Sequence, residues 1–507
     1  MKQPLNRLPS SPPSPASEAR PLIVMKFGGT SVGNAERFRQ CAMILGGAAR
    51  RDRVIAVVSA VAGVTDLIFR TIEATRQGDA EATQLNLRKF ESLHQTLIAG
   101  LFGGLQPAAA FEFFGQVFAQ FRGACMALLT LRTEISAETR DSLVSTGERL
   151  SAWLLADYLS QTGASGEFVR AEDAIVTDSN FGNAAPDMEA TAARCRETLL
   201  PMVARGHVAV VAGYSGATHD GRTTTLGRGG SDYSATIIGA ATHANEVWIW
   251  TDVDGVLSAD PRLCPDASIL PEITFAEAIE LAYYGAKVIH PKAAYPALEA
   301  GFPIWIKNSF RPEVPGTKIT LAGRPAESPV KAVTCVTHAT LMTLVTRGDV
   351  HPAELFGRLF MRLGQERIDM LFATQSSPEH ALGLVLRRED SARMMKLIQT
   401  TFRMELAQGI LNPVAVRDDV AVVAVLGESM RGTFGVLARL FSAVAATRVS
   451  VIAVAQGASE LSICFAVPSE SCTDVVRAVH AEFCGAGMAT ADPFHEEANQ
   501  IPASEAR

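Results

Sequence analysis

Five short apolar runs, separated by stretches with helical periodicity, constrain the fold of the region up to about residue 320. The runs are Leu22–Phe27, Val54–Val58, Val208–Ala212, Val247–Thr251 and Pro303–Lys307. Consecutive apolar positions are typical of strands in a parallel sheet that helices cover on both faces. Apolar residues with helical spacing lie between them, in the segments Asp66–Thr75, Arg149–Leu159, Ala190–Val203 and Tyr233–Ala241. The pattern predicts an α/β domain of three layers with a mainly parallel sheet over residues 22–320.

The last third of the chain repeats itself. Arg358, Leu359 and Phe360 recur 81 residues later as Arg439, Leu440 and Phe441. The apolar runs that follow also correspond, because Ile368–Thr374 precedes Gln375 as Val449–Ala455 precedes Gln456. Each copy has the order strand, helix, strand, strand, which is typical of a ferredoxin-like α+β unit. We expect one such domain at 331–411 and a second at 412–490.

The two ends of the chain differ in composition from the rest. Residues 1–21 contain six prolines and no apolar core of a signal peptide, so we predict a disordered tail. A plastid-type transit peptide is the less favoured interpretation. Residues 491–507 are predicted to be a flexible tail. The Gly/Pro-rich stretch Pro312–Pro325 is interpreted as the connection out of the first domain.

Composition excludes several classes of protein. The chain has 46 Lys and Arg against 53 Asp and Glu, a net charge of −7, which argues against nucleic-acid binding. It contains no apolar stretch of about 18 residues, so we expect no membrane span. Its eight cysteines include no CxxC pair and no zinc-like spacing. We therefore expect reduced thiols, no protein-bound metal and a cytoplasmic protein.

Two glycine-rich segments follow predicted strands and carry charge. Lys26 precedes Gly28 and Gly29, where the backbone can approach an anion closely. The loop Gly227–Asp232 precedes a helix predicted to start near Tyr233, so its amides and Arg228 suit an anionic ligand. Both segments also have structural interpretations: a plain strand-to-helix turn for the first, and for the second an N-cap at Ser231 with Asp232 as a first-turn acid.

Further segments are less specific. Thr251–Arg262 is a strand followed by a loop, and Tyr284–Pro291 has the Gly and Pro of an unusual backbone. We interpret His290 as a packed histidine rather than a base. Ser145–Glu148 has the pattern of a capping box before a helix, and spacing alone favours a structural role for Glu148.

Together these motifs resemble the signatures of aspartate kinases, with an amino-acid-kinase catalytic fold and tandem ACT domains. The resemblance is carried by Lys26–Val32, Gly227–Asp232, Thr251–Gly255 with Asp260–Arg262, Gly285–Val288, and Ile306–Asn308 with Pro315–Thr317. It implies phosphorylation of the L-aspartate side-chain carboxylate by ATP with Mg²⁺, the first step toward lysine, threonine and methionine. Aspartate is already ionised at neutral pH, so the reaction needs no general base.

The resemblance also implies roles for single residues. Lys26 and Asp232 would be catalytic. The substrate would contact Ser59, Thr65, Glu148, Tyr214, Arg228 and Ser231. ATP would contact Lys26, Gly28, Gly29, Thr30, Thr251, Asp252, Leu257, Arg262, Lys287 and Val288. Relatives often have Phe at the position of Tyr214 and Tyr at that of Leu257. Gln375 and Gln456 would bind an inhibitory amino acid, lysine or threonine or both, in a homodimer or dimer of dimers.

Three alternatives are weighed against this interpretation. Another amino-acid kinase acting on a different carboxylate would lack the combination of Glu148, the Gly227–Asp232 loop and the tandem units. A non-catalytic ACT sensor would be favoured by loss of Lys26 or Asp232, and both are present. A bifunctional kinase and homoserine dehydrogenase is disfavoured by length and because no G-x-G-x-x-G follows a late strand.

Overall fold

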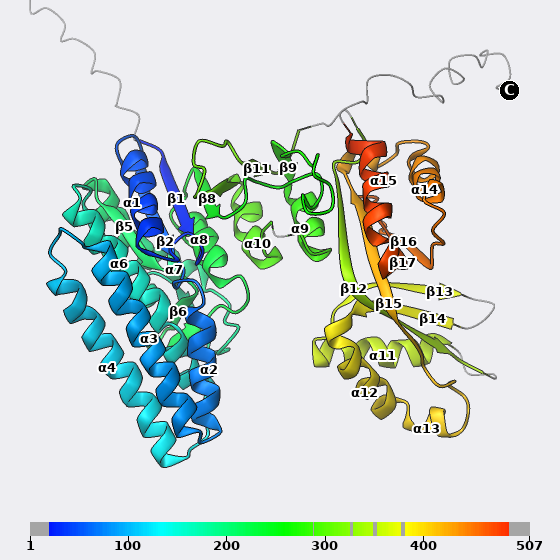
Figure 1. Cartoon of the computed structure of the whole chain (residues 1–507), viewed down its shortest axis with the longest axis horizontal. Coiled ribbons are helices and arrows are strands. Elements are labelled where there is room, and N and C mark those ends of the chain that lie inside the picture. Colours follow the sequence, from blue (N-terminus) through cyan, green and yellow to red (C-terminus); the bar gives the residue numbers. More distant parts are fainter. Residues whose placement is uncertain (1–19, 287, 325–327, 348–351, 377–380, 486–507) are drawn as a thin grey trace, which may run out of the picture.

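The computed structural model describes residues 20–286, 288–324, 328–347, 352–376 and 381–485. The predicted tails at 1–21 and 491–507 therefore lie almost wholly outside the described residues. Figure 1 shows the predicted α/β domain on one side and a smaller pair of α+β units on the other. None of the helices in the described part of the chain is long and apolar enough to cross a membrane. All eight cysteines are described, and each is a free thiol.

An eight-stranded sheet forms the centre of the first domain, in the order β3-β5-β2-β1-β8-β10-β11-β9. Its strands are β1 (Leu22–Phe27), β2 (Arg53–Val58), β3 (Gly166–Val169), β5 (Val208–Ala212), β8 (Glu246–Thr251), β9 (Glu272–Thr274), β10 (Ile304–Asn308) and β11 (Thr317–Thr320). All neighbours pair in parallel except β10 and β11. The five predicted strands are confirmed to within one residue. The interpretation of Pro312–Pro325 as a connection is wrong, because β11 belongs to the sheet.

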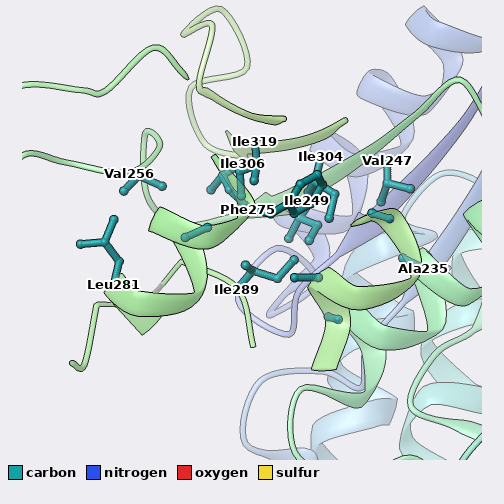
Figure 2. Close-up of a cluster of buried hydrophobic side chains, with 14 of the residues drawn as sticks. Ala235, Val247, Ile249, Val256, Phe275, Leu281, Ile289, Ile304, Ile306 and Ile319 are labelled. Atoms are coloured by element: carbon teal, nitrogen blue, oxygen red, sulfur yellow. The ribbon is translucent and has the colours of Figure 1, made fainter. Parts of the chain in front are cut away.

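Helices cover both faces of this sheet, as the apolar runs predict. Alternate residues of β1 point to opposite sides, with Val24 in one core and Met25 in the other. The helices α1 (Ala35–Ala49) and α6 (Thr146–Gln161) pack on the side of Met25. The helices α7 (Met188–Ala204), α8 (Gly230–Ala241), α9 (Phe275–Tyr283) and α10 (Pro291–Ala300) pack on the side of Val24. Figure 2 shows part of this second core, including Ala235, Val247, Phe275, Ile304 and Ile319.

A helical extension and a small sheet complete the domain. The extension consists of α2 (Val64–Arg76), α3 (Ala80–Leu101), α4 (Ala108–Leu131) and α5 (Ala137–Val144), and it projects from the sheet in Figure 1. The sequence interpretation includes α2 but not α3 or α4. The small sheet has the order β4-β6-β7, with β4 (Val176–Thr177), β6 (Ser215–Thr218) and β7 (Thr223–Thr225).

The predicted repeat is confirmed as two α+β units that share one six-stranded sheet, in the order β13-β14-β12-β15-β17-β16. The first unit contains β12 (Ala332–Val345), α11 (Pro352–Glu366), β13 (Met370–Ser376), β14 (Ala381–Arg387), α12 (Ser391–Thr401) and α13 (Arg403–Ala407). The second contains β15 (Ala415–Leu426), α14 (Val436–Ala446), β16 (Ala453–Gln456), β17 (Ser462–Pro468) and α15 (Cys472–Cys484).

The long strand β12 serves both units. Its first half pairs with β15 through Val333 and Val425, and Val333 packs in the core of the second unit. Its second half pairs with β14, and Met342 packs in the core of the first unit. The first unit is therefore inserted after a strand half that belongs to the second. The domain limits 331–411 and 412–490 stay a prediction.

Candidate active site

A cavity of about 540 Å³ opens at the carboxyl ends of β1, β2 and β5. This edge of a parallel sheet is where ligands bind in open α/β folds. Its lining includes both predicted catalytic residues, Lys26 and Asp232, together with Gly29. It also includes all six predicted substrate residues, which are Ser59, Thr65, Glu148, Tyr214, Arg228 and Ser231. The structure thus brings together residues from six separate segments of the sequence.

Three helices begin at this cavity. Ala62, Gly63 and Thr65 lie at the N-terminus of α2, and Gly229 to Asp232 lie at that of α8. Glu148 lies in the first turn of α6. Unpaired amides at a helix N-terminus carry partial positive charge and stabilise anions. The cavity is therefore suited to a ligand with negative charge.

Lys26 and Asp232 form an ion pair inside the cavity. Lys26 is the fifth residue of β1 and is 8% exposed. Its Nζ lies 2.5 Å from Asp232 Oδ1. Asp232 comes from the first turn of α8, as predicted. The pair holds a cation beside the Gly28–Gly29 turn, where Gly28 N–H donates to Trp250 O at 3.1 Å.

The glycine loop before α8 has a different cap from the one predicted. The N-cap is Gly229, with φ of 70°, and the helix begins at Gly230 rather than near Tyr233. The interpretation of Ser231 as the N-cap is therefore wrong, and its side chain lies on the cavity instead. A Cβ at Gly230 would lie 2.6 Å from the ring of Tyr214, so this close approach requires glycine.

Glu148 is a buried acid with no counter-charge among the residues that the structure describes. It is 3% exposed, and its Oε2 has no hydrogen-bond partner among the described residues. Burial raises its pKa to about 8, although backbone N–H groups, including that of Ala60, lower it in part. The close packing of α6 on the β2–α2 loop requires Gly147, because a Cβ there would lie 2.8 Å from Ala60 Cβ. An ammonium group in the cavity would supply the missing charge.

The predicted capping box at Ser145–Glu148 is wrong. Ser145 lies between the end of α5 and the start of α6 and has helical backbone angles. Its Oγ donates to Ser142 O at 2.9 Å and makes no cap for α6. The side chain of Glu148 is consequently free to face the cavity.

Arg228 and Tyr214 lie on the other wall of the cavity. Arg228 is exposed and forms no ion pair within the described ranges. Tyr214 has a left-handed backbone, with φ of 69°, and its N–H donates to Ser234 Oγ at 2.9 Å. Burial raises the pKa of its hydroxyl. His290 is half-buried and accepts a hydrogen bond from Lys292 N–H, as expected of a packed histidine.

Of the predicted nucleotide residues, Lys26 and Gly29 line this cavity, and the others are not part of its lining. Thr251 ends β8, and its Oγ1 donates to Asp252 at 3.2 Å. Leu257 pairs with Ile269, and Arg262 is exposed and paired with Asp260. The other nucleotide residues are Gly28 and Thr30 in the turn after β1, Val288, which is half-buried, and Lys287, which lies outside the described residues. Gln375 in β13 and Gln456 in β16 are exposed at matching places in the two units.

The sequence interpretation missed part of the lining. Gly182 borders the cavity with φ of 83°, and Ala60 to Gly63 with Asp66 form another border. The Asn180–Asn183 segment has turn residues that predict a loop, but nothing in its local pattern connects it to Lys26 or Glu148. Only the folded sheet brings these segments together.

Comparison with known proteins defines the class. A family model described as the amino acid kinase family matches residues 21–308, and an ACT domain model matches residues 423–483. The chain is a member of the amino acid kinase family, as its sheet and its cavity indicate. It is 32% identical to the lysine-sensitive aspartokinase 3 of Escherichia coli, over 91% of this chain and 98% of that protein. The chain therefore belongs to the aspartokinases, and the predicted resemblance is confirmed.

Other relatives include longer proteins. Bifunctional aspartokinase/homoserine dehydrogenases from Haemophilus influenzae and Zea mays are 30% and 31% identical over 90% and 91% of this chain. The chain spans 56% and 50% of the length of these two relatives. The crystal structure of E. coli aspartokinase III in complex with aspartate and ADP superposes with a TM-score of 0.75 at 29% identity, covering 91% of this chain and 99% of that chain.

Proposed function

We propose that this protein is an aspartate kinase, which transfers the γ-phosphoryl group of MgATP to the side-chain carboxylate of L-aspartate. The observation that carries the proposal is the cavity in which the Lys26–Asp232 pair, Glu148 and Arg228 converge. The relative from E. coli whose crystal structure contains aspartate and ADP supports the choice of substrates.

The zwitterion of aspartate matches the charges of the cavity. The buried carboxylate of Glu148 would pair with the α-ammonium group, and the exposed guanidinium of Arg228 would bind the α-carboxylate through two parallel hydrogen bonds. Ser59, Thr65, Tyr214 and Ser231 would supply the remaining polar contacts. This orientation directs the side-chain carboxylate toward Lys26.

The reaction needs charge stabilisation rather than proton transfer. A side-chain oxygen of aspartate attacks the γ-phosphorus, the bond to the β,γ-bridging oxygen breaks, and ADP leaves with that oxygen. Lys26 would stabilise the negative charge that develops on the phosphoryl oxygens, while Asp232 keeps its ammonium group in place. The Gly28–Gly29 turn lies beside it, where backbone amides can approach phosphate.

ATP would lie along the next strands of the sheet. Thr251 ends β8 and Asp252 follows it, and β8 is the neighbour of β1, so both residues are close to the end of the Lys26 strand. We assign nucleotide contacts to these residues and to Thr30, Leu257, Arg262, Lys287 and Val288. Mg²⁺ would enter with the nucleotide as part of the substrate.

We also propose feedback inhibition by an amino acid bound between ACT units. Lysine is the first candidate, because the relative at 32% identity is described as lysine-sensitive and a related crystal structure contains lysine. Threonine, alone or with lysine, is the alternative. Gln375 and Gln456 are exposed at the ends of matching strands, where they can meet a neighbouring unit in a homodimer or dimer of dimers.

The test is an assay of ATP turnover with hydroxylamine, which converts the acyl phosphate product into a hydroxamate that is detected as its coloured ferric complex. We expect turnover that requires L-aspartate and Mg²⁺, with L-glutamate and N-acetylglutamate giving rates near background. Turnover with another carboxylate and none with aspartate would assign the protein to a different member of the family. No turnover with any carboxylate would favour the amino-acid sensor.

A further inference from the structure

Asp141 is a buried carboxylate outside the cavity lining that connects two loops of the cavity wall. It lies on α5 and is 2% exposed. Its Oδ2 accepts hydrogen bonds from two backbone N–H groups, those of Gly182 and Thr225, each at 2.7 Å. Asp141 has no ion-pair partner within the described ranges. The two amides are thus the groups that satisfy this buried oxygen.

Both bonded segments lead directly to the cavity. Gly182 borders it, and Thr225 ends β7 three residues before Arg228. The two segments also touch each other, because a Cβ at Gly227 would lie 2.8 Å from Asn183 Oδ1. Arg228 is exposed and forms no ion pair with any described residue, so its place depends on the backbone that carries it.

Asp141 and Glu148 belong to one helical segment. The helix α5 ends at Val144 and α6 begins at Thr146, with Ser145 in helical conformation between them. Glu148 faces the cavity from α6, whereas Asp141 binds the opposite wall from α5. The bonds of Asp141 therefore fix the wall that carries Arg228 relative to the helix that carries Glu148.

We propose that Asp141 is a positioning residue that sets the separation between Glu148 and Arg228, and so determines the affinity for aspartate. This inference rests on the proposed function. Loss of the carboxylate leaves two amides without an acceptor and releases the Gly182 and Arg228 loops together. A shift of about 1 Å in a binding group is enough to reduce catalytic efficiency by about 100-fold.

The experiment compares Asp141→Ala and Asp141→Asn with wild type and with Asp79→Ala as a matched control. Asp79 also accepts a backbone N–H, that of Ala82 at 2.9 Å, but it caps α3 away from the cavity. Initial rates are measured by hydroxamate formation while aspartate and ATP are varied separately. Thermal unfolding is recorded for each variant.

We expect Asp141→Ala to raise the KM for aspartate by about 10- to 100-fold while the KM for ATP changes by less than about twofold. Asp141→Asn keeps one acceptor oxygen and should give an intermediate KM. Asp79→Ala should change neither KM. If Asp141→Ala does not fold, the Asn variant decides, and a rise of at least about threefold supports the proposal.

Two outcomes would overturn the inference while leaving the kinase activity intact. One is an unchanged KM for aspartate in both Asp141 variants, even with a lower melting temperature. The other is an equal rise of both KM values, which would indicate general loss of structure. Absence of aspartate-dependent turnover in wild type would instead refute the proposed function, and the inference with it.

Discussion

Two places in the molecule carry the same four-residue pattern and use it differently. Ser145–Glu148 and Thr274–Glu277 both have the spacing of a capping box, and both glutamates are buried in the first turn of a helix. At Thr274 the box forms: Thr274 Oγ1 accepts Glu277 N–H at 3.1 Å, and Glu277 Oε2 accepts Thr274 N–H at 2.9 Å. At Ser145 it does not.

The residue at the start of the pattern explains the difference. Thr274 is the last residue of β9 and has extended angles, φ −81° and ψ 161°, which allow its side chain to reach the amide three residues on. Ser145 follows α5 and has helical angles, φ −62° and ψ −13°. Its side chain cannot cap the helix, so Glu148 receives no bond from the cap.

The two glutamates differ in their partners, and this difference separates a structural role from a ligand-binding role. Glu277 pairs with the buried Lys331 at 2.9 Å and accepts Glu428 N–H at 2.9 Å, so it connects the first domain to the two α+β units. Glu148 has an oxygen without a partner among the described residues and faces a cavity. A buried charge that is paired and hydrogen-bonded can be kept inside the fold, whereas a buried carboxyl without such partners stays ionised at neutral pH only when a ligand supplies the counter-charge.

The largest effect is expected from Lys26→Ala. This variant removes the partner of Asp232, a carboxylate that is paired, as Glu277 is, but lies in the cavity, as Glu148 does. We expect kcat to fall by about 1000-fold or more with little change in the KM for aspartate, because the interaction of Lys26 strengthens only as charge moves to the leaving group. Single-turnover and steady-state rates of hydroxamate formation measure this. A kcat near that of wild type would remove Lys26 from the mechanism.

Glu277→Gln should affect stability rather than substrate binding. Removing one partner of a buried ion pair costs about 3–5 kcal/mol, because the other charge stays buried and unpaired. We expect a lower free energy of unfolding in urea, with the KM for aspartate within about threefold of wild type. The double variant Glu277→Gln/Lys331→Met should recover part of the loss. Unchanged stability of the single variant would show that the pair has no structural role.

Glu148→Gln should weaken substrate binding rather than lower the stability of the protein. We expect the KM for aspartate to rise by about 100-fold, since a charge pair in a closed site contributes about 2–5 kcal/mol when one partner is removed. The KM for ATP should stay near that of wild type. The free protein should unfold at a higher temperature than wild type at pH 8, because the variant no longer buries an unpaired charge. Lower stability together with an unchanged KM would give Glu148 the structural role of Glu277.

The ionisation of Glu148 also predicts how the stability of the protein changes with pH. Its pKa is raised to about 8 in the folded protein against an ordinary value of 4.5, so the free carboxyl is largely protonated at pH 7. The folded state then holds a proton that the unfolded state has lost. The stability contribution is therefore fully present below about pH 4.5 and decreases as pH rises toward 8.

We propose that aspartate binds to the form of the protein in which Glu148 is ionised. We therefore expect kcat/KM for aspartate to rise as pH increases through about 8, and aspartate binding at pH 7 to release protons. Calorimetry in two buffers of different ionisation enthalpy measures that release, and Glu148→Gln should abolish it. Proton uptake on binding would contradict the assignment.

The sequence predicts the scaffold better than the site. Strands such as Leu22–Phe27 are confirmed because fully apolar runs are local signals that burial enforces. The predicted capping of α6 and α8 is wrong, because Ser145 continues from α5 in helical conformation and Gly229, with a left-handed backbone, packs closely against His290. The role of Asp141 depends on amides 41 and 84 residues away, which no local pattern contains.

Contacts between domains lie further beyond the reach of local patterns. Ala259 and Cys264 come from the loop after β8, yet they are buried in the core of the second α+β unit. Ser258 Oγ lies 2.9 Å from Nε2 of His480 on α15. The segment predicted to bind nucleotide therefore also packs against the second α+β unit. Only the tertiary structure reveals that second role.

The smallest effect is expected from substitutions in the two α+β units. Gln375→Ala and Gln456→Ala should each raise the concentration of inhibitory amino acid needed for half-inhibition by about tenfold, because an effector acts only through its differential affinity for two states. Titrations with lysine, threonine and their mixture measure this, each relative to the variant's own uninhibited rate. Identical curves for both variants and wild type would place the effector elsewhere.

The pairing of Glu148 with the α-ammonium of aspartate is the central claim, and succinate tests it most directly because it lacks only that group. The measurement is kcat/KM for aspartate and for succinate in wild type and in Glu148→Gln, at pH 8. We expect wild type to prefer aspartate by about 100-fold or more, and the variant to lose most of that preference. An equal preference in both proteins would show that Glu148 does not recognise the ammonium group.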